Sequence, residues 1–230
     1  MIPSCVMRHV DNFQDLATTP FASGVNALCW PRSLSGDFAE VASRLGPGEG
    51  IVALSEARLK SLKVSAAGRE AIASMLKDLH GLRAQGHNPE LNGIYAYPRD
   101  DEAGTLPTDV YSFHADRAPI AAETWLCTYY GAPSEGVRND EARRRVDVPA
   151  LREELLGRFG GADDDAFAAH LKENCHDLHY VPLPHARPYS FGIGNLWRIA
   201  VDYPGSPVPP CIHRAPATLP GEPPRLLLIS

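Results

Sequence analysis

The C-terminal segment, residues 189–230, gives the clearest indication of fold class and reads YSFGIGNLWRIAVDYPGSPVPPCIHRAPATLPGEPPRLLLIS. It contains four short runs of the aromatic, β-branched and leucine side chains that are typical of strands, at 189–193, 196–203, 211–214 and 225–229. Proline or glycine separates each run from the next, and eleven of the 21 prolines lie between Pro182 and Pro224. Because proline lacks the N–H that a helix interior needs, this part is predicted to be a sheet of short strands without long helices.

Four similar runs lie upstream, at 93–97, 109–116, 124–130 and 178–183. Pro, Gly or Asp punctuates nearly every gap, which favours an antiparallel sandwich or barrel over a parallel sheet with crossover helices. One interruption is predicted to be helical, an insertion between strands at about 147–176, with one helix capped by Asp147 and a second running from 164 to about 175. The predicted fold class is therefore α+β with a mainly β core.

The first 92 residues indicate mixed structure with helices. Ser35 can cap a short helix that ends at Gly46-Pro47, and a longer helix is predicted over 66–82. Its apolar residues recur at the helical period: Ile72, Met75, Leu76, Leu79 and Leu82. We expect residues 1–92 to pack on a β-rich domain of residues 93–230, the two forming one compact unit.

The composition excludes several classes of protein. With 230 residues, 44% hydrophobic and 22% charged, the chain is that of an ordinary globular domain. Its net charge of −6 argues against nucleic-acid binding, which needs clustered Lys and Arg. No stretch of 18 apolar residues and no secretory signal is found, so we expect a cytoplasmic protein that does not enter membranes. Five cysteines without a CxxC spacing suit reduced thiols.

The run Tyr111-Ser112-Phe113-His114-Ala115-Asp116 places two metal-capable side chains on one strand face. The two-residue period of a strand puts His114 and Asp116 on the same side, about 7 Å apart at roughly 3.3 Å per residue. Both can therefore converge on one ion. Taken alone, the pair also fits a hydrogen-bonded surface couple.

The C-terminal region supplies the missing parts of a site. Cys211-Ile212-His213 is a short strand that ends in a histidine, and Arg225 opens the last apolar run. Two histidines and a carboxylate on one face leave three positions of an octahedral ion open, which suits Fe(II) with oxygen and a chelating cosubstrate. An arginine beside them can hold a carboxylate through two parallel hydrogen bonds.

On these residues the chain resembles the iron(II)- and 2-oxoglutarate-dependent oxygenases, whose pattern is His-x-Asp, a distant His, and an Arg ten to a dozen residues later. The matching positions are His114, Asp116, His213 and Arg225, and Gly194-Asn195-Leu196 resembles the turn and strand before the distal His. The resemblance covers roughly residues 93–230. Stretches 24–30, 113–117 and 213–216 also look like an uncharacterised bacterial group with the motif HxD...HRxP, which names no substrate.

The resemblance implies a double-stranded β-helix (jelly roll), the fold shared with cupins. It implies that His114, Asp116 and His213 hold Fe(II), that 2-oxoglutarate chelates the metal and pairs with Arg225, and that a small-molecule substrate is hydroxylated. One departure concerns the clamp, because the serine that often follows the arginine by two residues is Leu227 here. Arg214 is a rival arginine, but its strand position points it to the opposite face.

A hydroxyl from Tyr111, Thr128 or Tyr129 could replace the missing serine. Other reactive groups have simpler interpretations. The cluster Cys175-His176-Asp177-Leu178-His179, with His170 and His185 nearby, could bind zinc, but the chain leaves a helix for a strand there, which favours a structural role. Cys127 and Cys211 lie in apolar runs that favour inert core thiols.

Two other classes of function fit the same residues. One is a cupin-like metalloenzyme that does not use 2-oxoglutarate, and the other is a non-catalytic module that binds a metal or a small acid. Neither the substrate nor the oligomeric state follows from the residue pattern.

Overall fold

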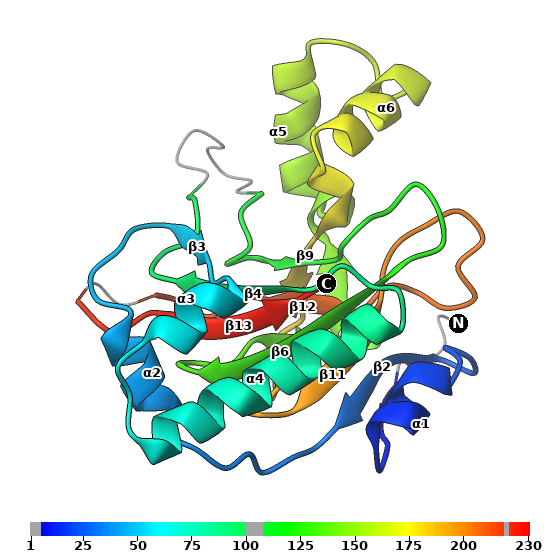
Figure 1. Cartoon of the computed structure of the whole chain (residues 1–230). Helices are drawn as coiled ribbons and strands as arrows, with labels where there is room; N and C mark the ends of the chain where they lie inside the picture. The colour runs from blue at the N-terminus through cyan, green and yellow to red at the C-terminus, as the bar shows by residue number, and fades with distance from the viewer. Residues whose placement is uncertain (1–5, 100–107, 219–220) are drawn as a thin grey trace.

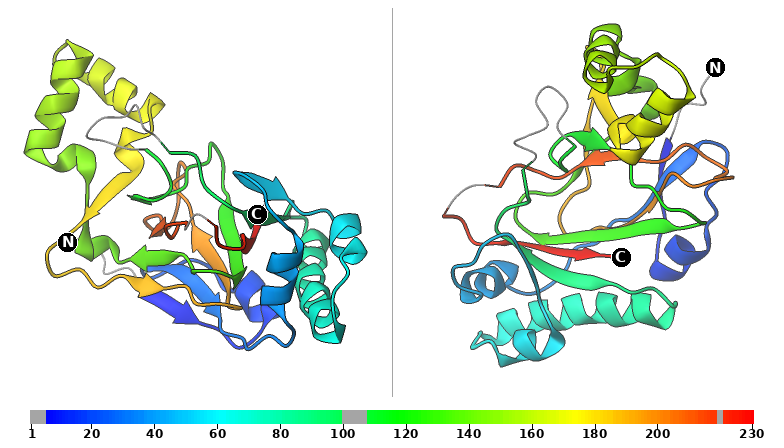
Figure 2. Two further views of the ribbon diagram at one scale, coloured as in Figure 1. Left: turned by 90° about the vertical axis from the view of Figure 1, so that its left-hand side faces the viewer. Right: turned by 90° about the horizontal axis from the view of Figure 1, so that it is seen from above.

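A computed structural model describes residues 6–99, 108–218 and 221–230. They form two β-sheets, with one group of helices on the outer face of the larger sheet and a second group projecting from the body (Figures 1 and 2). The helices are α1 (Phe13–Thr18), α2 (Phe38–Arg44), α3 (Glu56–Ser61), α4 (Ala66–Ala84), α5 (Pro149–Phe159) and α6 (Asp165–Glu173), with 3-10 turns η1 (Asn139–Glu141), η2 (Arg145–Asp147) and η3 (His176–Leu178).

The larger sheet has seven strands in the order β1-β2-β11-β6-β13-β4-β3. Apart from the parallel pair β1 and β2, all its neighbours are antiparallel. The strands are β1 (Val6–His9), β2 (Val25–Trp30), β3 (Ile51–Ala53), β4 (Glu90–Ile94), β6 (Glu123–Tyr130), β11 (Leu196–Ala200) and β13 (Arg225–Ile229).

The smaller sheet has six strands in the order β10-β7-β12-β5-β9-β8, all antiparallel. The strands are β5 (Phe113–His114), β7 (Glu135–Val137), β8 (Ala142–Arg144), β9 (His179–Pro182), β10 (Tyr189–Ser190) and β12 (Ile212–Arg214). The predicted α+β class with a β-rich core is confirmed.

The central strands of the larger sheet are buried on both faces. In β6, Trp125 and Cys127 pack in the apolar cluster beneath the helices, whereas Leu126 belongs to the cluster on the other face. In β13, Leu226 and Leu228 likewise face the helices, and Leu227 faces away from them. Since strand side chains alternate between faces, one set of residues anchors the helices and the other set is free to build a cavity against the smaller sheet.

The helices follow the predicted periodicity closely. The predicted 66–82 helix is α4, whose buried face includes Ile72, Met75 and Leu79 and whose N-cap is Ser65. Helix α2 begins later than expected, because Asp37 rather than Ser35 caps it. Among the described residues, no helix is both long and apolar enough to cross a membrane.

The predicted insertion is the pair α5 and α6, which projects from the body (Figure 1). The first helix begins at Pro149 after the N-cap Val148, so Asp147 is not its cap. It ends at Gly160, which adopts the left-handed conformation that favours glycine. The pair encloses a small apolar cluster of its own, made of Val146, Leu155, Phe167 and Leu171.

Five strands were not among those predicted. Strand β2 lies in the interior of the larger sheet between β1 and β11, although no strand was predicted there. Strands β1, β3, β7 and β8 have three or four residues each, too few to show a clear alternation. The first 92 residues therefore contribute β1, β2, β3 and most of the helices to the larger sheet and its cover.

A buried ion pair joins the helix layer to this sheet. Arg32 donates hydrogen bonds of 2.6 and 2.7 Å to the two carboxylate oxygens of Asp78 on α4, and the side chains are only 8% and 6% exposed. The hydroxyl of Tyr129 on β6 donates a third bond of 2.7 Å to the same carboxylate. The pair thus fixes the loop after β2, the helix and β6 at one point.

We expect Arg32→Met to lower the free energy of unfolding by about 3–5 kcal/mol, because it leaves the Asp78 carboxylate buried without a cation. Urea unfolding measures the loss. The control is Arg144→Met, which breaks a half-exposed pair with Asp147 and should cost less than about 1 kcal/mol. Equal losses in the two variants would contradict this account.

Candidate metal centre

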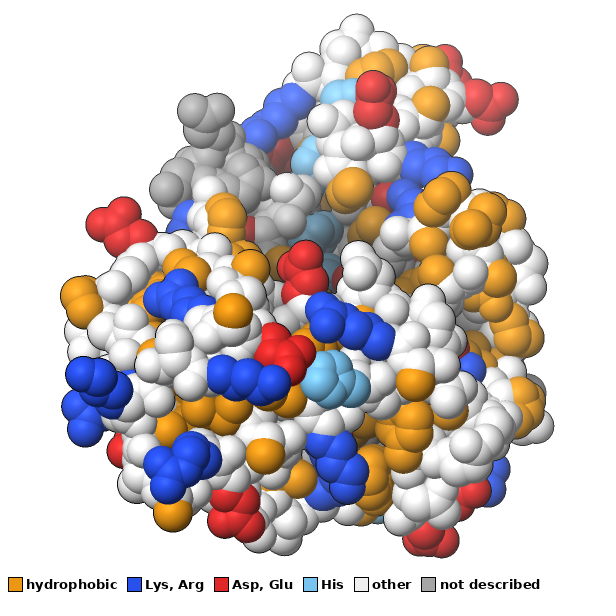
Figure 3. Space-filling model, viewed as in Figure 1, with side chains coloured by type: hydrophobic (Ala, Val, Ile, Leu, Met, Phe, Trp, Pro, Cys, Tyr) orange, Lys and Arg blue, Asp and Glu red, His pale blue; other side chains and the backbone are white. Residues whose placement is uncertain are grey.

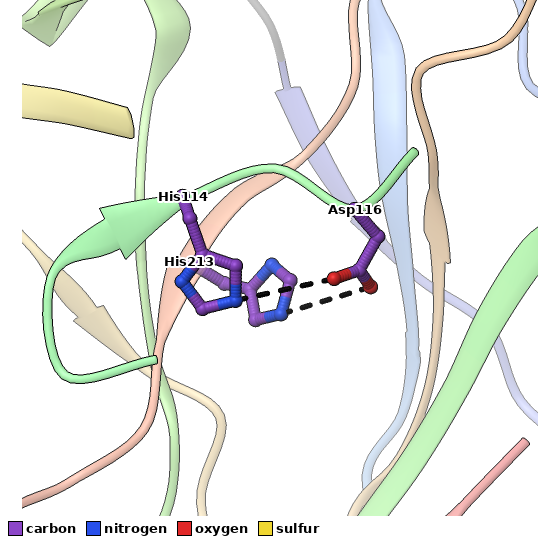
Figure 4. A group of neighbouring side chains, drawn as sticks. All are labelled: His114, Asp116 and His213. Atoms are coloured by element: carbon purple, nitrogen blue, oxygen red, sulfur yellow. Dashed lines mark ion pairs between the residues drawn. The ribbon is translucent and has the colours of Figure 1, made fainter. Parts of the chain in front are cut away.

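Strand pairing in the smaller sheet brings two distant histidines together. His213 of β12 is the register partner of His114 of β5, and the ring centroids are 4.6 Å apart. Asp116 follows β5 by two residues and turns its carboxylate toward both rings (Figure 4). The three predicted ligands therefore lie in one group, and no other set of three or more potential ligands is found among the described residues.

The distances suit one ion. The Nε2 atom of His114 lies 3.9 Å from Oδ1 of Asp116, and that of His213 lies 3.9 Å from Oδ2. All three ligand atoms are within 4.8 Å of one another. Two adjacent ligands bound at about 2.0–2.2 Å from one ion are about 3 Å apart, so side-chain rotations that close these distances by about 1–2 Å bring the set to bonding distance.

The backbone fixes which ring nitrogen of each histidine faces the centre. Nδ1 of His114 lies 2.9 Å from the carbonyl oxygen of Ser112, to which its N–H can donate. Nδ1 of His213 lies 3.4 Å from the carbonyl oxygen of Cys211. Both imidazoles are thereby oriented with Nε2 toward Asp116, the arrangement in which a metal-binding histidine holds its second nitrogen by a hydrogen bond.

Asp116 is held through both its side chain and its backbone. Thr124 of β6 donates a 2.6 Å hydrogen bond to Oδ2, and the backbone oxygen of Asp116 accepts a 2.8 Å bond from the N–H of Asp202. Burial raises the pKa of the Asp116 carboxyl, but the neighbouring His213, the Thr124 bond and His114 outweigh it, so this pKa lies below its ordinary value. The carboxylate is the form that binds a cation.

Arg117 holds the loop that carries Asp116. Its Nε donates a 2.8 Å bond to Asp202, and its two terminal nitrogens bind the carboxylate of Asp177. Asp177 lies in η3, at the end of the helical insertion. One side chain therefore ties the metal-ligand loop, the insertion and the turn after β11 together.

The His114 ring is held in its neutral form. Burial lowers its pKa from 6.5 to about 4, and repulsion from His213 and His179 adds to this effect. The hydrogen bond to Ser112 and the attraction of Asp116 oppose the shift without cancelling it. Neutral imidazole is the form that coordinates metals, so His114 is ready to bind an ion at neutral pH.

Arg225 faces the same centre. It lines a cavity of about 170 Å³ together with His114, Asp116 and His213, between the larger sheet and strands β5 and β12. Its side chain is buried, and no described carboxylate lies within ion-pair distance of it. Its Nε has no hydrogen-bond partner, and burial lowers the pKa of its guanidinium despite the nearby Tyr97. A buried cation without a counter-ion is costly and indicates a site for an anion.

Three hydroxyls surround this guanidinium. Tyr97 lies 2.6 Å from Nη1, and Thr128 and Ser134 each lie 2.8 Å from Nη2. Thr128 was one of three predicted partners. The other two bind elsewhere: Tyr111 bonds with the Tyr97 backbone and Thr218, and Tyr129 bonds with Asp78.

Tyr97 and Ser134 were not predicted, because only the tertiary structure shows which of the hydroxyl side chains face Arg225. The rival Arg214 pairs with Glu135 at 2.6 Å and stacks over Phe113, and it does not line the cavity. Arg214 therefore points away from the cavity, as its strand position predicted.

The other reactive groups do not form a second centre. In the 170–185 cluster, Asp177 pairs with Arg117 and His179 bonds with Ser112, while the rings of His170 and His176 are 6.3 Å apart. Burial raises the pKa of the Cys127 thiol to about 12, which suits an inert core residue.

A hollow lies on the face shown in Figure 3, beneath the helical insertion, and histidine side chains are visible inside it. No protein-family model, no curated protein and no solved structure matches this chain.

The metal-free protein should lose stability as the pH falls from about 6.5 to about 4. Over this range the unfolded chain protonates His114 and the folded protein does not, so the free energy of unfolding falls, by roughly 3 kcal/mol for a shift of this size. We expect His114→Gln to show a shallower decline in the same window. Urea unfolding with EDTA at pH 7, 6, 5 and 4.5 provides the comparison, and identical slopes would refute the assignment.

Proposed function

We propose that this chain is a non-haem Fe(II)- and 2-oxoglutarate-dependent oxygenase that hydroxylates a small molecule, with its two sheets as the halves of a double-stranded β-helix. The observation that carries the proposal is one cavity lined by the His114-Asp116-His213 group and by a buried arginine without a carboxylate partner. A metal site alone, or a buried arginine alone, would fit many functions. Together, a metal site and a buried arginine in one cavity fit a dicarboxylate that chelates the metal at one end and pairs with the arginine at the other.

The donor set fits iron. Two imidazoles and one carboxylate on one side of an ion form the facial set of non-haem Fe(II) oxygenases, which leaves positions for the cosubstrate and oxygen. Zinc sites with the same ligands keep fewer open positions. When bound, Fe(II) and 2-oxoglutarate supply the oxidising chemistry, in which O₂ and 2-oxoglutarate yield succinate and CO₂ while a substrate C–H bond becomes C–OH.

The clamp residues fit the far carboxylate of 2-oxoglutarate. Arg225, Tyr97 and Ser134 line the cavity, and Thr128 supports the guanidinium beside them. Each hydroxyl accepts a hydrogen bond from Arg225 and keeps its own proton to donate to an anion. These hydroxyls thereby take the place of the serine that Leu227 replaces.

The protein's remaining work is orientation and exclusion of water. Apolar side chains of the larger sheet, including Leu126, Leu227 and Ile94, line the cavity between the clamp and the ligands. They fix the orientation of the cosubstrate, with the carboxylate far from the metal at Arg225 and the 2-oxo acid end at the metal ligands. They also keep bulk water from the reacting centre. His114 stays neutral and Asp116 stays ionised at neutral pH, as a metal site requires.

Anaerobic Fe(II) with 2-oxoglutarate should produce a weak visible charge-transfer band, and His114→Ala should abolish it because one of the three ligands is lost. The control His80→Ala changes an exposed helix histidine and should keep the band. In air, succinate release should track the band. Tight metal binding without 2-oxoglutarate turnover would favour the cupin-like enzyme, and binding without any product would favour the non-catalytic module.

Arg225→Met should weaken 2-oxoglutarate binding by about tenfold to a hundredfold, the value of a charge-assisted hydrogen-bond pair. Titration of the visible band measures the affinity, and Mn(II) binding should stay unchanged because Arg225 is not a ligand. Arg214→Met is the matched control, since its guanidinium pairs with Glu135 outside the cavity. A larger effect of Arg214→Met would reassign the clamp.

A further inference from the structure

One buried polar side chain in the cavity is used by neither the metal ligands nor the clamp. Asn92 on β4 is 5% exposed and lines the cavity. No described residue forms a hydrogen bond with its side-chain amide. Its amide atoms reach the open space of the cavity, since they are not among the described polar atoms that are both sealed from solvent and unpaired. An amide without a protein partner, on a residue that is more than nine-tenths buried and faces a cavity, indicates a bound group.

The register places Asn92 one step outward from the clamp. On β13 the cavity face reads Arg225, Leu227, Ile229, from a 5% exposed inner end to a 40% exposed outer end. Asn92 is the register partner of Leu227. Its amide therefore lies between the buried guanidinium and the opening of the cavity.

Asn92 also lies on the flank away from the metal-ligand support. Strand β4 is on the opposite side of β13 from β6, whose Thr124 bonds with Asp116. At about 4.7–4.9 Å between neighbouring strands, Asn92 is separated from β6 by about 9–10 Å. A cosubstrate that extends from Arg225 to the metal ligands therefore leaves the part of the cavity next to Asn92 unoccupied.

The walls around Asn92 are uncharged. Ile51 on the neighbouring strand β3 and Ile229 on β13 line the cavity, yet they are 49% and 40% exposed, two of the few large apolar side chains on the surface of the described residues. Apart from the three ligands and Arg225, every described side chain that lines the cavity is uncharged. A second charged group in this flank would lose its hydration without gaining a partner.

We propose that Asn92, Ile51 and Ile229 form the substrate subsite, and that the substrate is an uncharged aliphatic compound with a carboxamide or a similar group that both donates and accepts hydrogen bonds. The asparagine amide offers one acceptor and two donors, so it can pair with a carboxamide through two bonds. The apolar side chains at the opening take the aliphatic part. This assignment names the substrate class of the proposed oxygenase and rests on that function.

The test uses three probes of equal chain length: pentanamide, pentanoate and pentylammonium. Their binding to Mn(II)-loaded protein with saturating 2-oxoglutarate is measured by calorimetry, and Mn(II)-induced relaxation of the probe protons reports their closeness to the metal. We expect pentanamide to bind at least tenfold more tightly than either charged probe. Asn92→Leu should weaken pentanamide binding about tenfold without changing Mn(II) affinity, 2-oxoglutarate affinity or Tm.

Glu90→Gln is the matched control, because Glu90 is an exposed residue on the same strand and does not line the cavity. Its pentanamide affinity should equal that of the wild type. Charged probes that bind as tightly as pentanamide would overturn the subsite, as would an Asn92→Leu variant that loses 2-oxoglutarate affinity instead. If 2-oxoglutarate does not bind but pentanamide binding still needs Asn92, the proposed oxygenase fails and the subsite stands.

Discussion

Burial of the larger sheet on both faces is the constraint on which the rest of the structure depends. Strands β6 and β13 give alternate side chains to the helix layer and to the cavity, so a residue that anchors α4 has a neighbour that builds the site. A shift of either strand by one residue would exchange these two sets. The buried pair of Arg32 and Asp78 opposes such a shift, because it fixes β6 against the helix through Tyr129.

The site itself depends on pairing between distant segments. His114 and His213 are almost a hundred residues apart and become neighbours only because β5 and β12 pair in one register. Two electrostatic conditions meet there. Both imidazoles are oriented by backbone carbonyls, and burial keeps the His114 ring neutral. The guanidinium of Arg225 is buried with hydroxyls as its only described partners. An anionic ligand supplies the partner that Arg225 lacks, and a cation is the natural ligand of the imidazoles and the Asp116 carboxylate.

The sequence predicted the parts of this arrangement that depend on local periodicity. Proline and glycine punctuation located most strands after residue 89. The predicted strand 109–116 is shorter than expected, because β5 spans only Phe113–His114, and Asp116 reaches His114 from the loop after the strand rather than through the strand period. Strand β2 was not recognised because its role follows from pairing with β11, far along the chain. Tyr97 and Ser134 were missed for the same reason: a hydroxyl becomes part of a clamp only through tertiary contact. The N-cap of α2 is Asp37, although Ser35 was predicted. Serine and aspartate are about equally good N-caps, and the sequence does not show which of two such residues, two positions apart, precedes the first helical residue.

The helical insertion has an apolar cluster separate from those of the sheets, so its stability depends on that small cluster rather than on the main core. A segment with its own small core can open locally at a lower free energy than the whole protein, so its backbone amides should exchange with solvent ahead of those in β6 and β13. Substitutions inside α5 and α6 should therefore lower the stability of the whole protein less than substitutions in the sheets. The exception is Asp177, where the insertion meets Arg117, because a substitution there also changes the position of the loop that carries Asp116, a candidate metal ligand.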